Sequence, residues 1–237
     1  MSPPPARTSR LAQRAGSPRG ARALVLDELR RRIVGLEYPP GTPLSENELA
    51  AALGVSRTPV RESLILLVED GLVNVVPQVG TFVSPLRESE IATAQFVREA
   101  LELASLEQAV PQVGEDDVED LRRSLADQRR AAARGEHDRF FALDEEFHLR
   151  LLAVSGHAAA WRSVSRAKVH LDRARRLSLP LPDQLDVLID QHEAVVDAVA
   201  AHDADTAATA LRSHLRKVFD DIAVVRAEHP EFFSDDR

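Results

Sequence analysis

The chain contains 237 residues, of which 44% are hydrophobic and 29% charged, and it has no cysteine. This composition is typical of a soluble globular protein, and the lack of cysteine excludes disulfides and thiolate metal sites. No apolar run approaches the ~20 residues that span a bilayer, and the basic, proline-rich N-terminus lacks the apolar stretch of a secretory signal. We therefore expect a cytoplasmic protein of one or two domains that does not contact a membrane.

The net charge of −8 is unevenly distributed along the chain. Residues 1–85 contain ten arginines and eight acidic residues, a net charge of +2, and the remainder carries −10. This asymmetry is expected when one domain of a protein binds a polyanion such as nucleic acid. Random variation in surface charge is the alternative explanation.

Residues 1–21 have four arginines, no acidic residue and few large apolar residues, which predicts a disordered basic arm. From Arg22 onward apolar residues recur at helical spacing until the break at 38–41. Ser45 and Glu48 then form the pattern of a capping box, which predicts a short helix to about Leu53.

A helix-turn-helix is predicted next. Gly54 permits a tight turn, and Ser56 is placed to cap a third helix that ends at Gly71. The apolar period then changes, and residues 72–76 and 81–83 read as two strands joined by a turn. A hairpin directly after a helix-turn-helix is a wing. We therefore predict a winged helix-turn-helix domain over residues 22–85.

The remainder of the chain is predicted to be entirely helical. Apolar spacing and Pro or Gly breaks indicate an antiparallel bundle of about six helices over residues 86–230, followed by a tail at 231–237. The fold class is thus mainly α, with a winged helix joined to a bundle. The expected bundle helices are 89–109, 116–134, 138–155, 158–179, 183–201 and 204–228.

Two arginines mark the start of the third helix of the winged domain. Arg57 and Arg61 are four residues apart, so they project from one face and can reach phosphates or guanine edges in a major groove. The hydroxyls of Ser56 and Thr58 suit phosphate oxygens. The alternative is that Ser56 only caps the helix and both arginines form surface ion pairs.

Four polar residues interrupt the apolar stripes of three bundle helices: Asp144, His148, His192 and His214. Asp144 and His148 are four apart and share an inward face. Polar groups buried in this way require partners, and three imidazoles with one carboxylate suit a divalent transition metal such as Zn, Ni or Mn. The alternative for each histidine is a hydrogen-bonded core residue.

Arg98 lies beside the apolar stripe of the first bundle helix, where its guanidinium could clamp a carboxylate through two parallel bonds. The alternative is a surface ion pair with Glu102.

Two other functions are possible for the metal site. It could belong to a hydrolase with Glu145 or Glu146 as base, or the metal could be purely structural.

Several stretches resemble GntR transcription regulators, and the helical remainder resembles the FCD effector domain of the FadR subgroup. The matching stretches are Pro40-Gly41-Thr42-Pro43-Leu44-Ser45-Glu46-Asn47-Glu48-Leu49-Ala50, Leu53-Gly54-Val55-Ser56-Arg57-Thr58-Pro59-Val60-Arg61-Glu62, Asp70-Gly71-Leu72 and Gly80-Thr81-Phe82-Val83.

The resemblance implies that Arg57 and Arg61 read or flank bases, that Thr58 contacts the DNA backbone and that Gly80 lets the wing approach the minor groove. Asn47 stands where the family often has a basic residue, so the resemblance does not predict the exact operator sequence. In the FCD domain the resemblance implies metal ligands in the pattern of the four polar residues above, and an organic-acid effector held near the metal by Arg98.

A single winged helix makes few contacts with DNA, and specific affinity usually requires two modules on symmetry-related half-sites. We therefore expect a homodimer that binds a pseudo-palindromic double-stranded DNA operator. The predicted function is an effector-responsive transcription regulator and not an enzyme.

Overall fold

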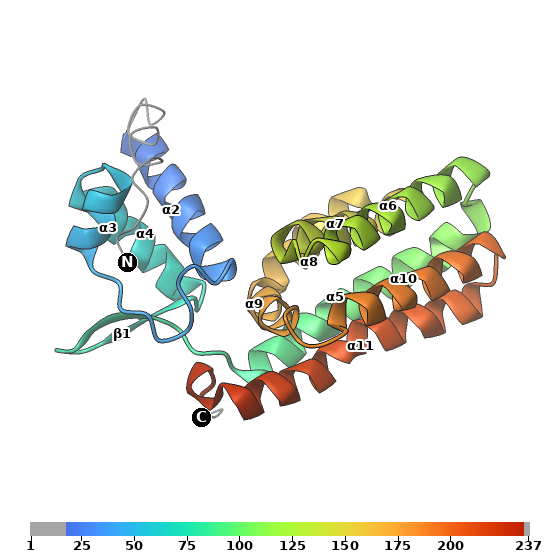
Figure 1. The fold of residues 1–237 in the computed structure, drawn as a ribbon. Coiled ribbons are helices and arrows are strands. Elements are labelled where there is room, and N and C mark those ends of the chain that lie inside the picture. The colour runs from blue at the N-terminus through green and yellow to red at the C-terminus, as the bar shows by residue number, and fades with distance from the viewer. Residues whose placement is uncertain (1–17, 235–237) are drawn as a thin grey trace. The chain divides into compact units, whose positions relative to one another are not determined.

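The computed structural model describes residues 18–234, which form two compact units, and the predicted fold class is confirmed (Figure 1). The first unit extends to Leu86 and also includes Glu231 and the residues just after it, whereas the second unit comprises Arg87–Pro230. The amide of Leu86 donates to the carbonyl of Phe232 at 2.8 Å, so the segment after the last long helix pairs with the end of the winged domain. No described helix is long and apolar enough to cross a membrane.

Three helices form the winged unit: α2 (Pro18–Val34), α3 (Glu46–Leu53) and α4 (Arg57–Glu69). Helix α2 begins four residues before the predicted start, because a proline fits the first turn of a helix, where no amide partner is needed. Most of the predicted basic arm, residues 1–17, lies outside the described residues. The apolar core of the unit contains Val25, Leu29, Ile33, Leu49, Leu53, Val60, Leu64, Leu67 and Leu72.

The turn between α3 and α4 has the predicted form with one correction. Ser45 Oγ accepts a hydrogen bond from the amide of Glu48 at 3.4 Å, and Gly54 adopts the left-handed conformation with φ of 66°. Ser56 occupies the N-cap position of α4, but its side chain makes no capping hydrogen bond. The exposed hydroxyl of Ser56 is therefore available to solvent or to another molecule.

The wing is a two-stranded antiparallel sheet of β1 (Val73–Val76) and β2 (Gly80–Val83). Val73 pairs with Val83, and Val76 pairs with Gly80 at the tip. An isolated bridge between Pro43 and Phe82 ties the segment before α3 to β2. The wing and the helix-turn-helix are thus joined through backbone hydrogen bonds.

The second unit is built from seven α-helices, and its long members run alongside one another in Figure 1. Buried apolar residues such as Leu106, Phe147 and Leu211 form the central core of this bundle. The helices are α5 (Glu88–Ala109), α6 (Glu115–Ala133), α7 (His137–Val154), α8 (Trp161–Ala167), α9 (Val169–Ser178), α10 (Gln184–Ala200) and α11 (Ala204–Glu228).

The prediction of one continuous helix over 158–179 was wrong, because the helix breaks at Lys168 between α8 and α9. Lys168 is 2% exposed, and its ammonium donates to both carboxylate oxygens of Asp172 and pairs with Glu145. A buried ammonium requires such partners, and the backbone at this position leaves helical geometry while the side chain reaches them. Apolar periodicity alone does not report that requirement.

The left-handed turn at Gly54 generates a test of the winged unit. Gly54→Ala places a Cβ in a conformation that costs an L-residue about 1–2 kcal/mol, so the first unit should unfold at lower urea concentration. Circular dichroism during urea titration would measure this change. Gly114→Ala is the matched control, because Gly114 has φ of −99° and a Cβ there would lie 3.7 Å from Oδ2 of Asp117, an ordinary van der Waals contact. Equal destabilisation by both variants would contradict the strain argument.

Candidate metal centre and nucleic-acid interface

The four predicted metal ligands converge inside the bundle. Asp144 and His148 project from α7, His192 from α10 and His214 from α11, and none is more than 4% exposed. One ligand atom from each residue lies within 4.8 Å of the others. Three helices therefore bring residues from distant parts of the sequence to one buried point.

The spacing of the imidazole nitrogens fits a shared cation. Nε2 of His214 lies 3.1 Å from Nε2 of His192 and 3.2 Å from Nε2 of His148. Nitrogen ligands about 2.0–2.1 Å from a tetrahedral or octahedral ion are separated by about 3.0–3.4 Å from one another. His214 therefore stands at the separation that coordination requires from both His148 and His192.

The opposite nitrogen forms a hydrogen bond with an amide oxygen in two of the rings, and in the third it lies against a carboxylate oxygen. Nδ1 of His192 lies 2.8 Å from Oε1 of Gln128, and Nδ1 of His214 lies 3.1 Å from Oε1 of Gln191. Nδ1 of His148 lies 2.6 Å from Oε2 of Glu102. An acceptor at Nδ1 favours the tautomer that carries the proton there, so all three Nε2 lone pairs point toward the same place.

Gln128 is itself oriented, because its amide nitrogen donates to the carbonyl of Leu143 at 3.5 Å and its oxygen is left to face His192. Sequence reasoning missed Gln128 and Gln191 and treated Glu102 only as a partner of Arg98. A polar residue on the inner face of a predicted helix was the available signal for Gln128, which is fully buried.

Asp144 presents its two oxygens to different groups. Oδ2 pairs with the guanidinium of Arg175, a residue the sequence analysis did not select. Oδ1 has no hydrogen-bond partner among the described residues and lies 3.7 Å from Nε2 of His192. A buried carboxylate oxygen without a partner is costly, and a cation between it and the imidazoles would satisfy it. The donor set is therefore three nitrogens and one oxygen.

The ionisation states of these groups favour metal binding at neutral pH. Burial lowers the pKa of His192 to about 3, despite the opposing effect of Asp144, so its imidazole is neutral. Burial acts to raise the pKa of Asp144, but the charge of Arg175 holds it well below the ordinary value. Metal ligands must be deprotonated, and both residues meet that condition.

Arg98 forms the ion pair with Glu102 that was the alternative to effector binding. It pairs with Glu102 through Nε at 2.7 Å, but this pair lies inside the bundle, where Arg98 is 2% exposed. Burial acts to raise the pKa of Glu102, but Arg98 and His148 together lower it to about 2. Nη2 of Arg98 has no hydrogen-bond partner among the described residues. One arm of the guanidinium is thus held while the other is free for an anion.

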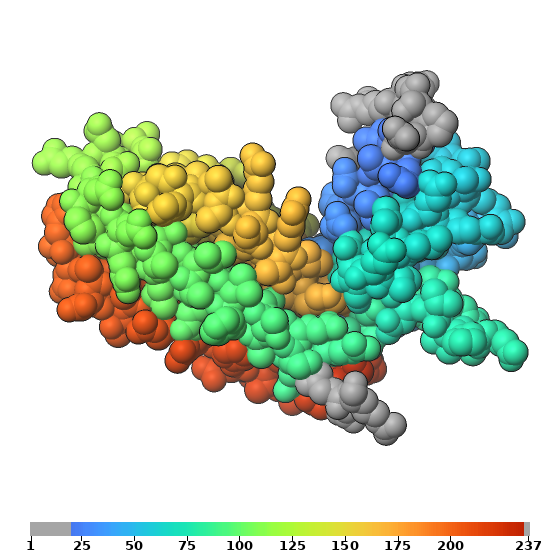
Figure 2. Space-filling view, turned by 180° about the vertical axis from the view of Figure 1, so that it is seen from behind, coloured from blue at the N-terminus to red at the C-terminus, as the bar shows by residue number. Residues whose placement is uncertain are grey.

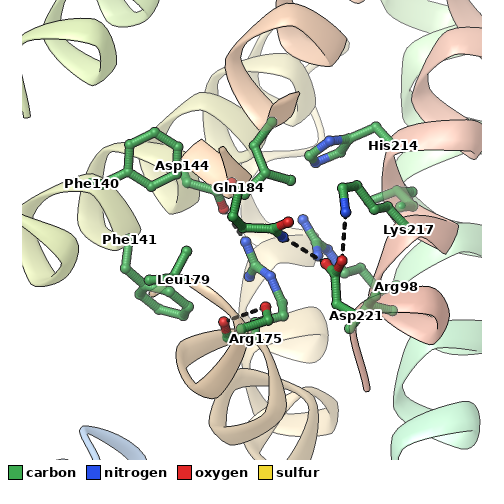
Figure 3. Close-up of a pocket in the computed structure, with 14 residues that line it drawn as sticks. Arg98, Phe140, Phe141, Asp144, Arg175, Leu179, Gln184, His214, Lys217 and Asp221 are labelled. Carbon is green, nitrogen blue, oxygen red and sulfur yellow. Dashed lines mark hydrogen bonds and ion pairs between the residues drawn. The ribbon is translucent and has the colours of Figure 1, made fainter. Parts of the chain in front are cut away.

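Two of the four candidate ligands, Asp144 and His214, line a small cavity (Figure 3). Its volume is about 20 Å³, which is room for about one water molecule. Arg98, Arg175 and Lys217 supply positive charge to its wall, and Phe140 and Leu179 supply apolar surface. At the rim, the amide of Gln184 donates to Asp221 at 2.6 Å, as the dashed line in Figure 3 marks.

The two carboxylates that a hydrolase would need are already engaged. Glu145 binds Lys168 and Arg175, and Glu146 accepts from Arg150 at 2.7 Å. Neither is among the residues that line the cavity. This arrangement gives the hydrolase alternative no general base at the cation site.

On the winged unit, the predicted DNA-contacting side chains are exposed on α3 and at the start of α4. They are Asn47, Ser56, Arg57, Thr58 and Arg61. Glu46 joins the two arginines: Arg57 Nη2 donates to it at 3.0 Å, and Arg61 donates through Nε and Nη2 at 2.9 Å each. The predicted alternative of surface ion pairs is thus present in the free protein, through Glu46.

Glu46 holds the arginines side by side and was not selected from the sequence. Hydrogen bonds from Arg61 and then Arg57 lower its pKa to about 2, so it stays ionised. Gly80 lies exposed at the tip of the wing, as predicted. In the winged unit the predicted DNA-contacting residues are exposed, and in the bundle the four predicted metal ligands lie together.

Residues 22–83 match the family model for bacterial regulatory proteins of the gntR family, and residues 94–217 match the FCD domain model. The chain is 49% identical over 88% of both chains to an uncharacterised HTH-type transcriptional regulator of Streptomyces ambofaciens. It is 34% identical to the HTH-type transcriptional repressor RspR of Escherichia coli K12, over 88% of this chain and 91% of that protein. The chain belongs to the GntR family of transcriptional regulators.

The fold is shared with solved GntR structures. A putative GntR regulator from Rhodococcus sp. RHA1 superposes with a TM-score of 0.70 at 24% identity, covering 87% of this chain and 97% of that one. Escherichia coli McbR/YncC gives a TM-score of 0.69 at 22% identity, with 88% and 98% covered. The curated relatives above are named as HTH-type transcriptional regulators, in agreement with the predicted class of protein, and the GntR domain implies DNA binding.

The ligand set predicts a metal-dependent protein. His192→Ala removes one of three nitrogen donors and should weaken Zn²⁺ or Ni²⁺ binding by about 100-fold or more, since few donors remain. Competition with a chromogenic chelator would measure the affinity. His157→Ala is the matched control, because His157 is exposed and contacts Gln108. Unchanged affinity in His192→Ala would exclude this centre.

Gln128 offers a test that leaves all four ligands in place. Gln128→Leu preserves side-chain volume and charge but removes the acceptor at Nδ1 of His192, so metal affinity should fall about 10–100-fold. The same chelator competition would detect it, with the melting temperature of the metal-free protein as the control for folding. A variant that binds metal as tightly as the wild type would show that the orientation of His192 does not depend on Gln128.

Proposed function

We propose that this regulator binds a pseudo-palindromic operator as a homodimer and that a small carboxylate, bound at a divalent transition metal in the FCD domain, modulates this binding. The observation that carries the proposal is the convergence of three buried imidazole lone pairs and one unpartnered carboxylate oxygen beside a cavity lined by Arg98. Zn, Ni and Mn all accept such a donor set. Assignment to the FadR subgroup remains a prediction.

The DNA half of the proposal rests on Arg57 and Arg61. Their side chains are 58% and 61% exposed, and Glu46 neutralises them in the free protein. Phosphate or guanine would replace Glu46 as the acceptor, while the backbone amides at the start of α4 and the hydroxyls of Ser56 and Thr58 would bind phosphate. Asn47 would add a hydrogen bond without charge, and Gly80 would bring the wing backbone close to the minor groove.

The effector half rests on Arg98 and the charge around the cavity. The unpartnered Nη2 of Arg98 supplies a donor for a carboxylate, and the metal when bound would supply a second, Lewis-acidic contact. A cavity of about 20 Å³ is too small for such a ligand, so rim residues such as Leu179, Gln184 and Lys217 must move when it enters. Because these residues belong to or adjoin the bundle helices, their movement would change how the helices pack when the effector binds.

A coupling of about 1–3 kcal/mol between effector and operator would be enough to change DNA occupancy. The relatives that are named as repressors include RspR and a probable D-xylose utilization operon repressor of Paenarthrobacter nicotinovorans, which is 31% identical. These names support repression as the direction of regulation. The protein would then act in the cytoplasm, where its DNA lies.

Loss of either recognition arginine should weaken DNA binding. Arg57→Ala and Arg61→Ala should each cost about 1–3 kcal/mol of operator affinity and lower the slope of log affinity against log salt by about 1 if the contact is to phosphate. Fluorescence anisotropy on a duplex selected from a random library would measure both. Arg123→Ala, an exposed arginine on α6 that pairs with Asp120, is the control. A salt-independent affinity would contradict phosphate contacts.

Arg98 tests the effector site. Arg98→Lys keeps a cation beside Glu102 but cannot form two parallel bonds, so carboxylate affinity should fall about tenfold or more while metal affinity is retained. A thermal-shift screen of small mono- and dicarboxylates on metal-loaded protein, followed by calorimetry, would measure it. If chelator lowers the melting temperature but no carboxylate binds the loaded protein, the metal is structural only.

A further inference from the structure

A chain of ion pairs leads away from the metal centre into the bundle. Arg175 on α9 pairs with Asp144 through Nη2, and its Nη1 donates to Oε1 of Glu145 at 2.7 Å and lies 3.5 Å from Oδ1 of Asp172. The other oxygen of Glu145 pairs with the ammonium of Lys168, which also donates to both oxygens of Asp172 at 2.8 and 2.7 Å. Figure 3 shows Arg175 reaching from α9 toward Asp144. These five charged groups form one network, here named the Lys168 network.

The Lys168 network is largely enclosed by the bundle. Lys168 is 2% exposed and Asp172 is 7% exposed, and the side chains of Arg175 and Glu145 are 12% and 20% exposed. Figure 2 shows α8 and α9, in yellow to amber, along α5, in green, and both of these helices pack against α5. A buried charge that loses its partner retains the full cost of desolvation. Each member of the network is therefore held in position by its neighbours.

Glu145 is the carboxylate that lies between the two cations. Burial acts to raise its pKa, but the charges of Arg175 and Lys168 lower it below the ordinary value. Burial raises the pKa of Asp172 instead. Arg175 therefore divides its hydrogen bonds between two ionised carboxylates, those of Asp144 and Glu145. Because Glu145 holds Nη1, it fixes the direction from which the guanidinium contacts Asp144.

We propose that Glu145 and Lys168 are positioning residues of the metal site, which act through Arg175 to aim Oδ1 of Asp144 at the cation. Oδ1 has no hydrogen-bond partner among the described residues, whereas Oδ2 is held by Arg175. The direction of that hold decides where Oδ1 points, since a carboxylate group is rigid and planar. This inference rests on the metal site of the proposed function and extends it to two residues that are not ligands.

The single tryptophan of the chain lies beside the far end of the Lys168 network. Nζ of Lys168 is 5.5 Å from the ring centroid of Trp161 and 5.8 Å from that of Phe141. An ammonium at this distance interacts electrostatically with an aromatic ring. Zn²⁺ that binds to Asp144 should therefore change the fluorescence of Trp161, because the ion pairs of the network connect the two residues.

The first test compares Glu145→Gln with Glu146→Gln in the full chain. Glu145→Gln keeps the shape of the side chain but removes its charge, so Arg175 should turn toward Asp144, and Zn²⁺ affinity should fall about tenfold or more in chelator competition. Glu146→Gln is the matched control, because Glu146 is exposed on the same helix and accepts from Arg150. It changes the net charge equally and should bind Zn²⁺ like the wild type.

Glu145→Asp separates the position of the carboxylate from its charge. The shorter side chain keeps the charge but cannot reach both Arg175 and Lys168, so a positioning role predicts weakened Zn²⁺ binding here too. Wild-type affinity in Glu145→Asp, with weak binding in Glu145→Gln, would reduce Glu145 to a source of charge and overturn the inference. Circular dichroism checks folding, and Glu145→Asp also serves as the test if Glu145→Gln does not fold.

Two spectra distinguish positioning from a purely structural role. The visible absorption of Co²⁺-loaded protein reports the geometry of the ligands, and it should change in both Glu145 variants but not in Glu146→Gln. The response of Trp161 fluorescence to saturating Zn²⁺ should be present in the wild type and in Glu146→Gln and be lost in Glu145→Gln. A variant that is only less stable, with unchanged spectra and affinity, would overturn the inference.

The same measurements separate this inference from the metal site on which it rests. A wild-type chain that binds Zn²⁺ and Co²⁺, with Glu145 variants that bind them equally well, would overturn the positioning role and leave the metal site standing. A wild-type chain that binds neither ion would overturn both.

Discussion

The bundle depends on how three buried imidazole lone pairs are satisfied. An acceptor beside each Nδ1 places the ring proton on that atom. The Nε2 atoms of His148 and His192 each lie within hydrogen-bonding distance of Nε2 of His214, but in this tautomer no proton lies between them. Without a cation, these lone pairs repel one another, and Oδ1 of Asp144 has no hydrogen-bond partner among the described residues. A single divalent ion resolves both problems, and metal content is therefore expected to influence the packing of the whole domain.

Every long helix of the bundle contributes to that centre or to its immediate support. Helices α7, α10 and α11 carry the ligands, α5 contributes Glu102, and α6 contributes Gln128. Structural and sensory roles of the metal are consequently not exclusive. Arg98 and Arg175 each contact a residue of the centre and also line the adjoining cavity, so an anion bound there would act on the groups that orient His148 and Asp144. These shared contacts would couple the binding of an anion in the cavity to the geometry of the metal site.

A comparable exchange of charge partners operates at the DNA-reading end. Glu46 neutralises Arg57 and Arg61 in the free protein and holds them at adjacent positions, which reduces the conformational entropy they lose on binding. DNA must replace this carboxylate with phosphate or base oxygens. When DNA binds, the released Glu46 carboxylate must be solvated by water or accept a hydrogen bond from a base edge. The net electrostatic free energy of DNA binding is therefore the difference between the contacts that the arginines make with DNA and those that they make with Glu46.

The sequence by itself determined the order of the elements, the family and the four candidate ligand residues, because these depend on local periodicity, capping residues and short motifs. Apolar stripes interrupted at fixed helical positions were sufficient to place Asp144, His148, His192 and His214 on inward faces. The break at Lys168 was missed, because it depends on the buried partner Glu145, which lies 23 residues earlier in the chain.

Only the tertiary structure decided which groups support the site. Gln191, Arg175 and Glu46 acquire their roles from neighbours on other elements, and no local pattern distinguishes them from ordinary surface polar residues. Gln128 lies on an inner helix face, but only the fold shows that it faces His192. Arg98 shows the difference most clearly. The sequence offered effector binding or pairing with Glu102 as alternatives, whereas folding buries the arginine so that one arm pairs with Glu102 and the other stays open. Long-range packing, and not spacing along the chain, determines which hydrogen-bond donors remain unsatisfied.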